Sequence, residues 1–202
     1  MDKLEEIHYH DTLIVSFGGY AQKFGGIQPY EFLSFLNKNF PKTDKLFLKD
    51  TYCSNYHRGI RGISTSVETT VDFLKTKINV VDISGNSIYR KVLFLGNSAG
   101  GYAALLFGSL LNVNFILAFV PQTILYLEDK NPLYKNLAPF INEVTKYYVY
   151  GDLSVKDHKD PHHISHCENI NKFNVTVIRK DHIDLKKLRD SGELKNIIED
   201  II

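Results

Sequence analysis

Ser98 stands between two glycines in the stretch LFLGNSAGGYAALL, which runs from Leu93 to Leu106. Gly96, Ser98 and Gly100 make the pattern G-x-S-x-G. A serine at a sharp turn between a strand and a helix suits nucleophilic chemistry, because its hydroxyl projects from the turn and the helix N-terminus stabilises negative charge. Glycines on either side allow neighbouring backbone to approach closely. We therefore expect a strained turn with Ser98 at its tip. The alternative is a structural turn in which the serine only caps a helix.

Strand-like and helix-like segments alternate along the chain. The six short apolar runs are TLIVSF (12–17), KLFLK (45–49), KVLFLG (91–96), VNFILAFV (113–120), KYYVYG (146–151) and NVTVIR (174–179). Several are unbroken, as in strands that are covered on both faces. Helix-length segments lie at 28–40, 66–78, 98–111 and 184–202. This alternation predicts an α/β fold, a three-layer sandwich in which a mostly parallel sheet of about six strands carries helices on both faces.

The stretch around Ser98 resembles the nucleophile elbow of the α/β-hydrolase superfamily of serine esterases, lipases and thioesterases. The order of elements fits the same core from about Thr12 to Ile202. The resemblance implies a catalytic triad in the chain order serine, acid, histidine. It places the acid after the next-to-last strand and the histidine after the last strand.

His182 is the only histidine after the last expected strand, and we expect it to be the base that takes the Ser98 proton. Three aspartates follow the next-to-last strand. Asp160 ranks first because it precedes Pro161 and an expected helix, Asp157 ranks second, and Asp152 ranks third because it directly follows the strand. The chosen acid would orient the imidazole.

The oxyanion hole needs two backbone donors. The resemblance implies that one comes from Ala99, the residue after the nucleophile, and the other from the loop after the first strand. That loop contains Gly18, Gly19 and Tyr20, and we expect the second donor from Gly19 or Tyr20. Phe17 stands where the family usually has a histidine, so the donor's identity stays open.

Two further groups of polar residues invite interpretation. His158, His162 and His166 are spaced by four in DHKDPHHISH, but Pro161 interrupts a continuous helix and the pattern lacks the glutamate of H-E-x-x-H. We expect solvated histidines and no metal. In YHRGIRG (56–62), Arg58 and Arg61 are candidates for contact with an anionic substrate group, or belong to an exposed loop.

Composition indicates an ordinary soluble globular protein. Hydrophobic residues make up 44% of the 202 residues, charged residues 23%, and the formal net charge is +1, without a basic block that favours nucleic acid. Cys53 and Cys167 lie far apart, which favours reduced thiols. No apolar run is long enough for a transmembrane helix, and the polar segment MDKLEEIHYHD is unlike a signal peptide. We expect a cytoplasmic location.

We therefore expect one α/β-hydrolase domain over residues 1–202 that cleaves an ester, thioester or similar acyl bond in a small-molecule substrate, without a cofactor. The segment 121–144 is either a small lid over the site or an ordinary surface crossover. Two other functions stay open. One is an acyltransferase with the same triad, and the other is a non-catalytic member of the fold that binds a ligand or a partner.

Overall fold

The fold is built on a six-stranded parallel sheet. The computed structural model describes residues 10–20, 30–126 and 131–202. The strands are β1 (Thr12–Gly18), β2 (Asp44–Lys49), β3 (Lys91–Asn97), β4 (Phe115–Phe119), β5 (Lys146–Asp152) and β6 (Val175–Lys180). They are hydrogen-bonded in the order β2-β1-β3-β4-β5-β6, and every neighbouring pair is parallel. The predicted parallel sheet is therefore confirmed.

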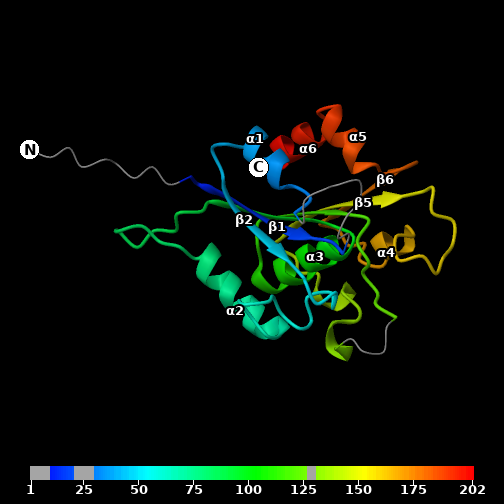
Figure 1. Ribbon diagram of the computed structural model, residues 1–202, viewed down its shortest axis with the longest axis horizontal. Coiled ribbons are helices and arrows are strands. Elements are labelled where there is room, and N and C mark those ends of the chain that lie inside the picture. The colour runs from blue at the N-terminus through cyan, green and yellow to red at the C-terminus, as the bar shows by residue number, and fades with distance from the viewer. Residues whose placement is uncertain (1–9, 21–29, 127–130) are drawn as a thin grey trace, which may run out of the picture.

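Helices cover both faces of this sheet, as the strand–helix alternation predicts (Figure 1). One layer contains α1 (Leu33–Asn39), α5 (Leu185–Asp190) and α6 (Glu193–Ile201). The other contains α2 (Val67–Ile78), α3 (Ala99–Leu111) and the short α4 (Ser165–Glu168). No described helix is both long and apolar enough to cross a lipid bilayer.

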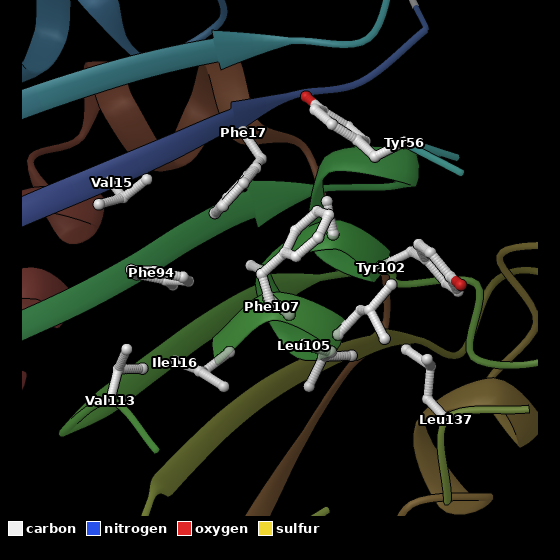
Figure 2. Packing of buried hydrophobic residues seen from close by; sticks show 14 of the residues in the cluster. Val15, Phe17, Tyr56, Phe94, Tyr102, Leu105, Phe107, Val113, Ile116 and Leu137 are labelled. Atoms are coloured by element: carbon white, nitrogen blue, oxygen red, sulfur yellow. The ribbon is translucent and has the colours of Figure 1, made fainter. Parts of the chain in front are cut away.

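Alternating side chains explain why both faces need a helical layer. Leu13 and Val15 of β1 lie in one hydrophobic cluster, whereas Ile14 between them lies in the other. Consecutive strand residues point to opposite faces, so an unbroken apolar run makes both faces hydrophobic. In the larger cluster, Phe17 packs against the rings of Phe94 and Phe107 at centroid distances of 5.3 and 5.7 Å (Figure 2).

The ends of the helices follow local chemistry. At the start of α2, the Ser66 side chain accepts a hydrogen bond from the Thr69 amide, and the Thr69 hydroxyl accepts one from the Ser66 amide. The single closing segment expected at 184–202 forms two helices instead of one. Gly192 lies between them with a φ of 83°, a left-handed conformation that ends one helix before the next begins.

The segment 121–144 contains two short 3-10 turns, η1 (Pro132–Tyr134) and η2 (Ala138–Phe140), and no α-helix in its described part. Residues 127–130 lie outside the described residues. Leu125 and Leu137 are buried in the larger hydrophobic cluster, and the Tyr102 hydroxyl on α3 donates to the Tyr134 carbonyl oxygen at 2.7 Å. The segment therefore packs against α3 through both apolar and polar contacts.

Candidate active site

The site lies where the order of the sheet changes direction. The chain goes from β1 outward to β2 and then returns to place β3 on the other side of β1. In parallel sheets, ligands bind beyond the carboxyl ends of the strands at such a switch point. Gly18 ends β1 and Asn97 ends β3, so Ser98 lies directly at this position.

Ser98 adopts the strained backbone expected from the sequence, with φ 53° and ψ −119°. Its amide donates to the Phe119 carbonyl oxygen of β4 at 2.9 Å, and its own carbonyl oxygen accepts from the Tyr102 amide of α3 at 2.9 Å. A non-glycine residue in such a conformation costs about 1–3 kcal/mol and persists only when its surroundings hold it. Here the sheet and the helix both hold it.

The two glycines of the motif are required by close backbone contacts. A Cβ on Gly96 would lie 2.1 Å from the Gly100 carbonyl oxygen, and a Cβ on Gly100 would lie 2.1 Å from the Phe17 carbonyl oxygen. Neither position has room for a side chain without movement of the backbone. The motif therefore packs the start of α3 against the ends of β1 and β3.

The Ser98 hydroxyl oxygen lies 2.7 Å from Nε2 of His162. His162 belongs to the segment between β5 and α4 and lies outside any helix. Sequence reasoning considered this histidine as a metal ligand or a solvated side chain and did not connect it with Ser98. The only available signal was its position after a strand, which His158 and His163 share.

His182 lies beside Asp152 in the structure, with 3.1 Å between its Nδ1 and Asp152 Oδ2. The amide of Ile183 also donates to this carboxylate oxygen at 2.9 Å. The acid ranked first, Asp160, does not lie in this position. Asp152 ends β5 and is paired with Lys180 of β6, so the strand register brings it next to His182, two residues beyond Lys180.

The surroundings of Asp152 stabilise its ionised form. Burial raises the pKa of Asp152. Hydrogen bonds from the Ile183 amide and from the amide and hydroxyl of Ser154 lower it, as does the nearby His182. The lowering effects are larger, so the pKa lies below its ordinary value. The Asp152 side chain is 7% exposed, whereas that of His182 is 62% exposed. A fixed, buried carboxylate therefore orients an accessible imidazole.

The other two candidate aspartates have local partners. Asp160 Oδ1 accepts from the His162 amide at 2.8 Å and lies 3.7 Å from His162 Nδ1. Asp157 Oδ1 accepts from the Lys159 amide at 2.9 Å, as in an Asx-turn. Asp160 is thus next to the histidine that contacts Ser98, and Asp157 shapes the turn before it.

The loop after β1 reaches the elbow. A Cβ on Gly19 would lie 3.1 Å from the Asn97 carbonyl oxygen, which shows how closely the loop approaches the residue before Ser98. The Gly18 carbonyl oxygen accepts from the Tyr56 hydroxyl at 2.8 Å, and the Tyr20 hydroxyl accepts from the Asn55 amide. Residues 21–29 of this glycine-containing loop lie outside the described residues.

A half-buried glutamate that the sequence analysis did not single out also borders the elbow. The Asn97 side-chain amide donates to Glu31 Oε1 at 3.3 Å, and Glu31 Oε2 is buried without a hydrogen-bond partner. Burial raises the pKa of Glu31, while the amides of Asn97 and Gly19 and the charge of Lys49 oppose the rise. Its isolated position before α1 carried no motif that marked it in the sequence.

The two arginines lie in different surroundings. Arg58 places its guanidinium carbon 4.9 Å from the centre of the Tyr52 ring, a cation–π contact. Arg61 lines a cavity of about 510 Å³ together with Lys49 and Tyr20. The described residues contain no group of three or more His, Cys, Asp or Glu side chains arranged to hold a metal ion.

Solved structures share this architecture. A lipase-esterase related protein from Clostridium acetobutylicum aligns over 95% of this chain and 94% of its own, with a TM-score of 0.57 and 13% identity. The capsule O-acetyltransferase of Neisseria meningitidis serogroup A aligns over 92% and 87%, with a TM-score of 0.58 and 16% identity. The fold is α/β-hydrolase-like. Est1E from Butyrivibrio proteoclasticus, solved with ferulic acid bound, shares it over 94% and 88%, with a TM-score of 0.55 and 9% identity.

No protein-family model and no curated protein matches the sequence. The likeness to an α/β-hydrolase-like architecture therefore comes from the structure, at identities that establish the fold alone.

Proposed function

We propose that this protein is a serine acyl hydrolase that cleaves an ester, thioester or similar acyl bond through a Ser98 acyl-enzyme. One observation carries the proposal. Ser98 stands at a strained turn at the carboxyl edge of the sheet, and Nε2 of His162 lies 2.7 Å from its hydroxyl oxygen. A serine hydroxyl is a weak nucleophile until a neighbouring base removes its proton, and this geometry brings nucleophile and base chemistry together.

The histidine hydrogen-bonded to Ser98 in this structure is His162. His182, which follows β6 at the same edge of the sheet, is nevertheless the proposed base, and Asp152 is the acid that orients it. The 3.1 Å contact between them and the lowered pKa of Asp152 support this pair. The ionised carboxylate holds a proton on His182 Nδ1, which leaves the Nε2 lone pair free to accept one. Asp152 replaces Asp160 in this role, because Asp160 lies beside a different histidine.

The proposed reaction has two steps. Ser98 Oγ attacks the acyl carbon, its proton passes to the imidazole, and the bond to the leaving group breaks as that group takes the proton. Water then attacks the acyl carbon of the acyl-enzyme and gives one proton to the imidazole. The bond from the acyl carbon to Ser98 Oγ breaks as the imidazolium returns that proton to Oγ, which releases the acid and the free serine. Ala99 begins α3, and amides in the first turn of a helix have no acceptor within that helix. The Ala99 N–H and a second backbone N–H, from Gly19 or Tyr20, are the proposed oxyanion hole.

The cavity beside Tyr20 is the proposed place for part of the substrate. Its walls combine apolar side chains such as Phe47 and Ile60 with the cations of Lys49 and Arg61 and with Asp50, whose carboxylate accepts from backbone amides. An acyl compound that carries an apolar part and a carboxylate or phosphate fits this lining.

Acyl transfer is the second candidate, because the same acyl-enzyme can be intercepted by an alcohol instead of water. The fold shared with a capsule O-acetyltransferase supports acyl transfer as this second candidate. Product analysis with an added alcohol or sugar acceptor separates the two, since transfer produces a new ester in proportion to the acceptor.

The direct test is labelling with a fluorophosphonate probe, followed by rates on p-nitrophenyl esters of increasing chain length. Wild type and Ser84→Ala, which changes an exposed serine, should label and turn over. Ser98→Ala should do neither, with turnover reduced by at least about 10³-fold. Equal labelling of wild type and Ser98→Ala would show that Ser98 is not the nucleophile. No labelling of any form would favour a non-catalytic role.

A further inference from the structure

Two histidine–aspartate pairs lie at the carboxyl edge of the sheet, and the reaction proposed above uses only one. His182 is 3.1 Å from Asp152, and His162 is 3.7 Å from Asp160. The imidazole within 2.7 Å of Ser98 Oγ belongs to His162, from the second pair. A hydrogen bond of this length is short enough for direct proton transfer.

A short hydrogen-bonded turn holds the His162 ring in this place. The His162 amide donates to Asp160 Oδ1 at 2.8 Å, and the His163 amide donates to the Asp160 carbonyl oxygen at 3.0 Å. Residue 163 also forms a parallel bridge with Asp152 at the end of β5. The turn is therefore attached to the same strand end that orients His182, which keeps both imidazoles at one edge of the sheet.

The surroundings of His162 favour the tautomer that accepts a proton from Ser98. The Asp160 carboxylate lies on the Nδ1 side of the ring and favours a proton on Nδ1. The Nε2 lone pair then points at the Ser98 hydroxyl, so the hydroxyl donates to the ring. Both side chains of the pair are about two-fifths exposed, so Asp160 orients His162 more weakly than the buried Asp152 orients His182.

We propose that His162 is a second catalytic histidine, which accepts the Ser98 proton during formation of the acyl-enzyme. The proposal rests on the Ser98 chemistry of the preceding section. As Oγ forms its bond to the acyl carbon, the Oγ proton moves to His162 Nε2. The bond from the acyl carbon to the leaving group then breaks, and the leaving group takes that proton, so His162 returns to its neutral form. Loss of His182 therefore leaves a weaker route to the acyl-enzyme.

The test measures second-order rates of fluorophosphonate labelling of Ser98 in His182→Ala and in His162→Gln/His182→Ala. Glutamine can keep a hydrogen bond to Ser98 but cannot take a proton, which separates base catalysis from simple positioning. A general base contributes about 10²–10⁴-fold, and a weakly oriented one should lie toward the lower end. We expect His182→Ala to label at least about tenfold faster than the double variant.

The pH dependence of the labelling rate is a second readout, and a purely structural role of His162 would not change it. Acid pH should slow labelling of His182→Ala, because protonation removes the accepting lone pair of His162, and the double variant should lack this dependence. His158→Ala/His182→Ala is the matched control, because His158 lies on the same segment and its ring packs at a tilt against His163 instead of contacting Ser98. It should label like His182→Ala.

Each outcome decides one question. Equal rates for His182→Ala and the double variant, with normal labelling of wild type, would overturn the role of His162 and leave the proposed function intact. Faster labelling after His162→Gln alone would also overturn it, because His162 would then obstruct the serine. Failure of wild type to label at Ser98 would instead overturn the proposed function. Circular dichroism checks that each variant is folded.

Discussion

Ser98 is held in a backbone conformation that serine rarely adopts, with φ 53° and ψ −119°. Its neighbours enforce this conformation through the hydrogen bond to Phe119 and the close packing of Gly96 and Gly100. The strain is coupled to chemistry, because the same turn presents the hydroxyl to an imidazole at the edge of the sheet. Stability and activity should therefore respond differently to substitution at this one residue.

Ser98→Gly should stabilise the protein while abolishing activity. Glycine adopts positive φ at no steric cost, so the substitution removes the backbone strain. The entropy that glycine loses on folding offsets part of this gain, and the free energy of unfolding should rise by about 1 kcal/mol. Ser98→Ala is the control, because it removes the hydroxyl but keeps the Cβ and the strain. Urea unfolding of both variants measures the difference, and a less stable Ser98→Gly would show that the turn is not strained.

Asp152→Asn should reduce turnover far more than Asp160→Asn. Asn at 152 cannot hold the proton on His182 Nδ1 as a carboxylate does, and loss of a triad acid costs up to about 10⁴-fold in kcat. Asp160 is solvent-accessible and orients His162 weakly, so its loss should cost less than about tenfold. Steady-state rates on one aryl ester measure both. The reverse order would return the role of triad acid to Asp160.

At the level of elements, two features assemble the site. The connection from β3 to α3 places Ser98, and the pairing of β5 with β6 places Asp152 beside His182. The first is rigid because β3 is a central strand and α3 packs on β1, β3 and β4. In the second, β5 is paired on both sides, with β4 and with the edge strand β6. The segment between β5 and α4 has no helix before α4, and its turn at Asp160, together with the bridge between residue 163 and Asp152, positions His162.

Gly100→Ala should destabilise the protein and reduce activity together. Its Cβ would lie 2.1 Å from the Phe17 carbonyl oxygen, so α3 must shift away from β1. Overpacking of this kind costs about 1–3 kcal/mol, and backbone contact favours the upper end. Gly101→Ala is the matched control, because its Cβ would meet its neighbours at 3.2 Å or more. Chemical denaturation should show the larger loss for Gly100→Ala, and equal losses would contradict the close approach.

For the whole molecule, stability comes from two hydrophobic layers on either side of one sheet. The larger layer contains the aromatic group around Phe17, with Tyr56, Phe94 and Phe107 (Figure 2). This group adjoins the site, because the Tyr56 hydroxyl donates to the Gly18 carbonyl oxygen and a Cβ on Gly100 would lie 2.1 Å from the Phe17 carbonyl oxygen. The core and the site are therefore adjacent, and loss of packing at Phe17 should affect both.

Phe17→Ala should lower the free energy of unfolding by about 3–5 kcal/mol, because it opens a cavity at a side chain with no exposed surface. Phe173→Ala is the matched control, since Phe173 is 82% exposed and its loss should change stability by less than about 0.5 kcal/mol. Thermal or urea unfolding compares the two variants. Similar effects would contradict the packing assigned to Phe17.

Stability should also fall as the pH drops below about 6.5, because of His166. Burial lowers the pKa of His166 from its ordinary value of 6.5, His163 and His162 lower it further, and Asp160 opposes them. The unfolded chain then binds the proton more readily than the folded protein, so protonation favours unfolding until the folded-state pKa is passed. Above the ordinary value both states are neutral, and this contribution is fully present.

Unfolding measured at several pH values tests this assignment. His166→Gln keeps an acceptor for the Ile124 amide and should flatten the pH dependence below about pH 6.5 relative to wild type. An unchanged slope in His166→Gln would assign the pH dependence to other groups.

Local patterns in the sequence were sufficient for the strands, the helices on both faces and the turn at Ser98. Apolar runs of strand length and helical spacing depend on neighbouring residues alone, and G-x-S-x-G specifies a turn because only glycine fits the close contacts on both sides. The division of the closing segment into α5 and α6 was also encoded locally, at Gly192, although helical spacing on both sides concealed it.

The partners of the two histidines were decided only by the tertiary structure. Asp152, Asp157 and Asp160 are equivalent as residue types, and the strand register between β5 and β6 brings Asp152 to His182. The contact of His162 with Ser98 depends on how the segment after β5 folds back across 64 residues of sequence. Hydrogen bonds between distant segments require angles and distances that only the assembled sheet supplies, so no local pattern could have selected these pairs.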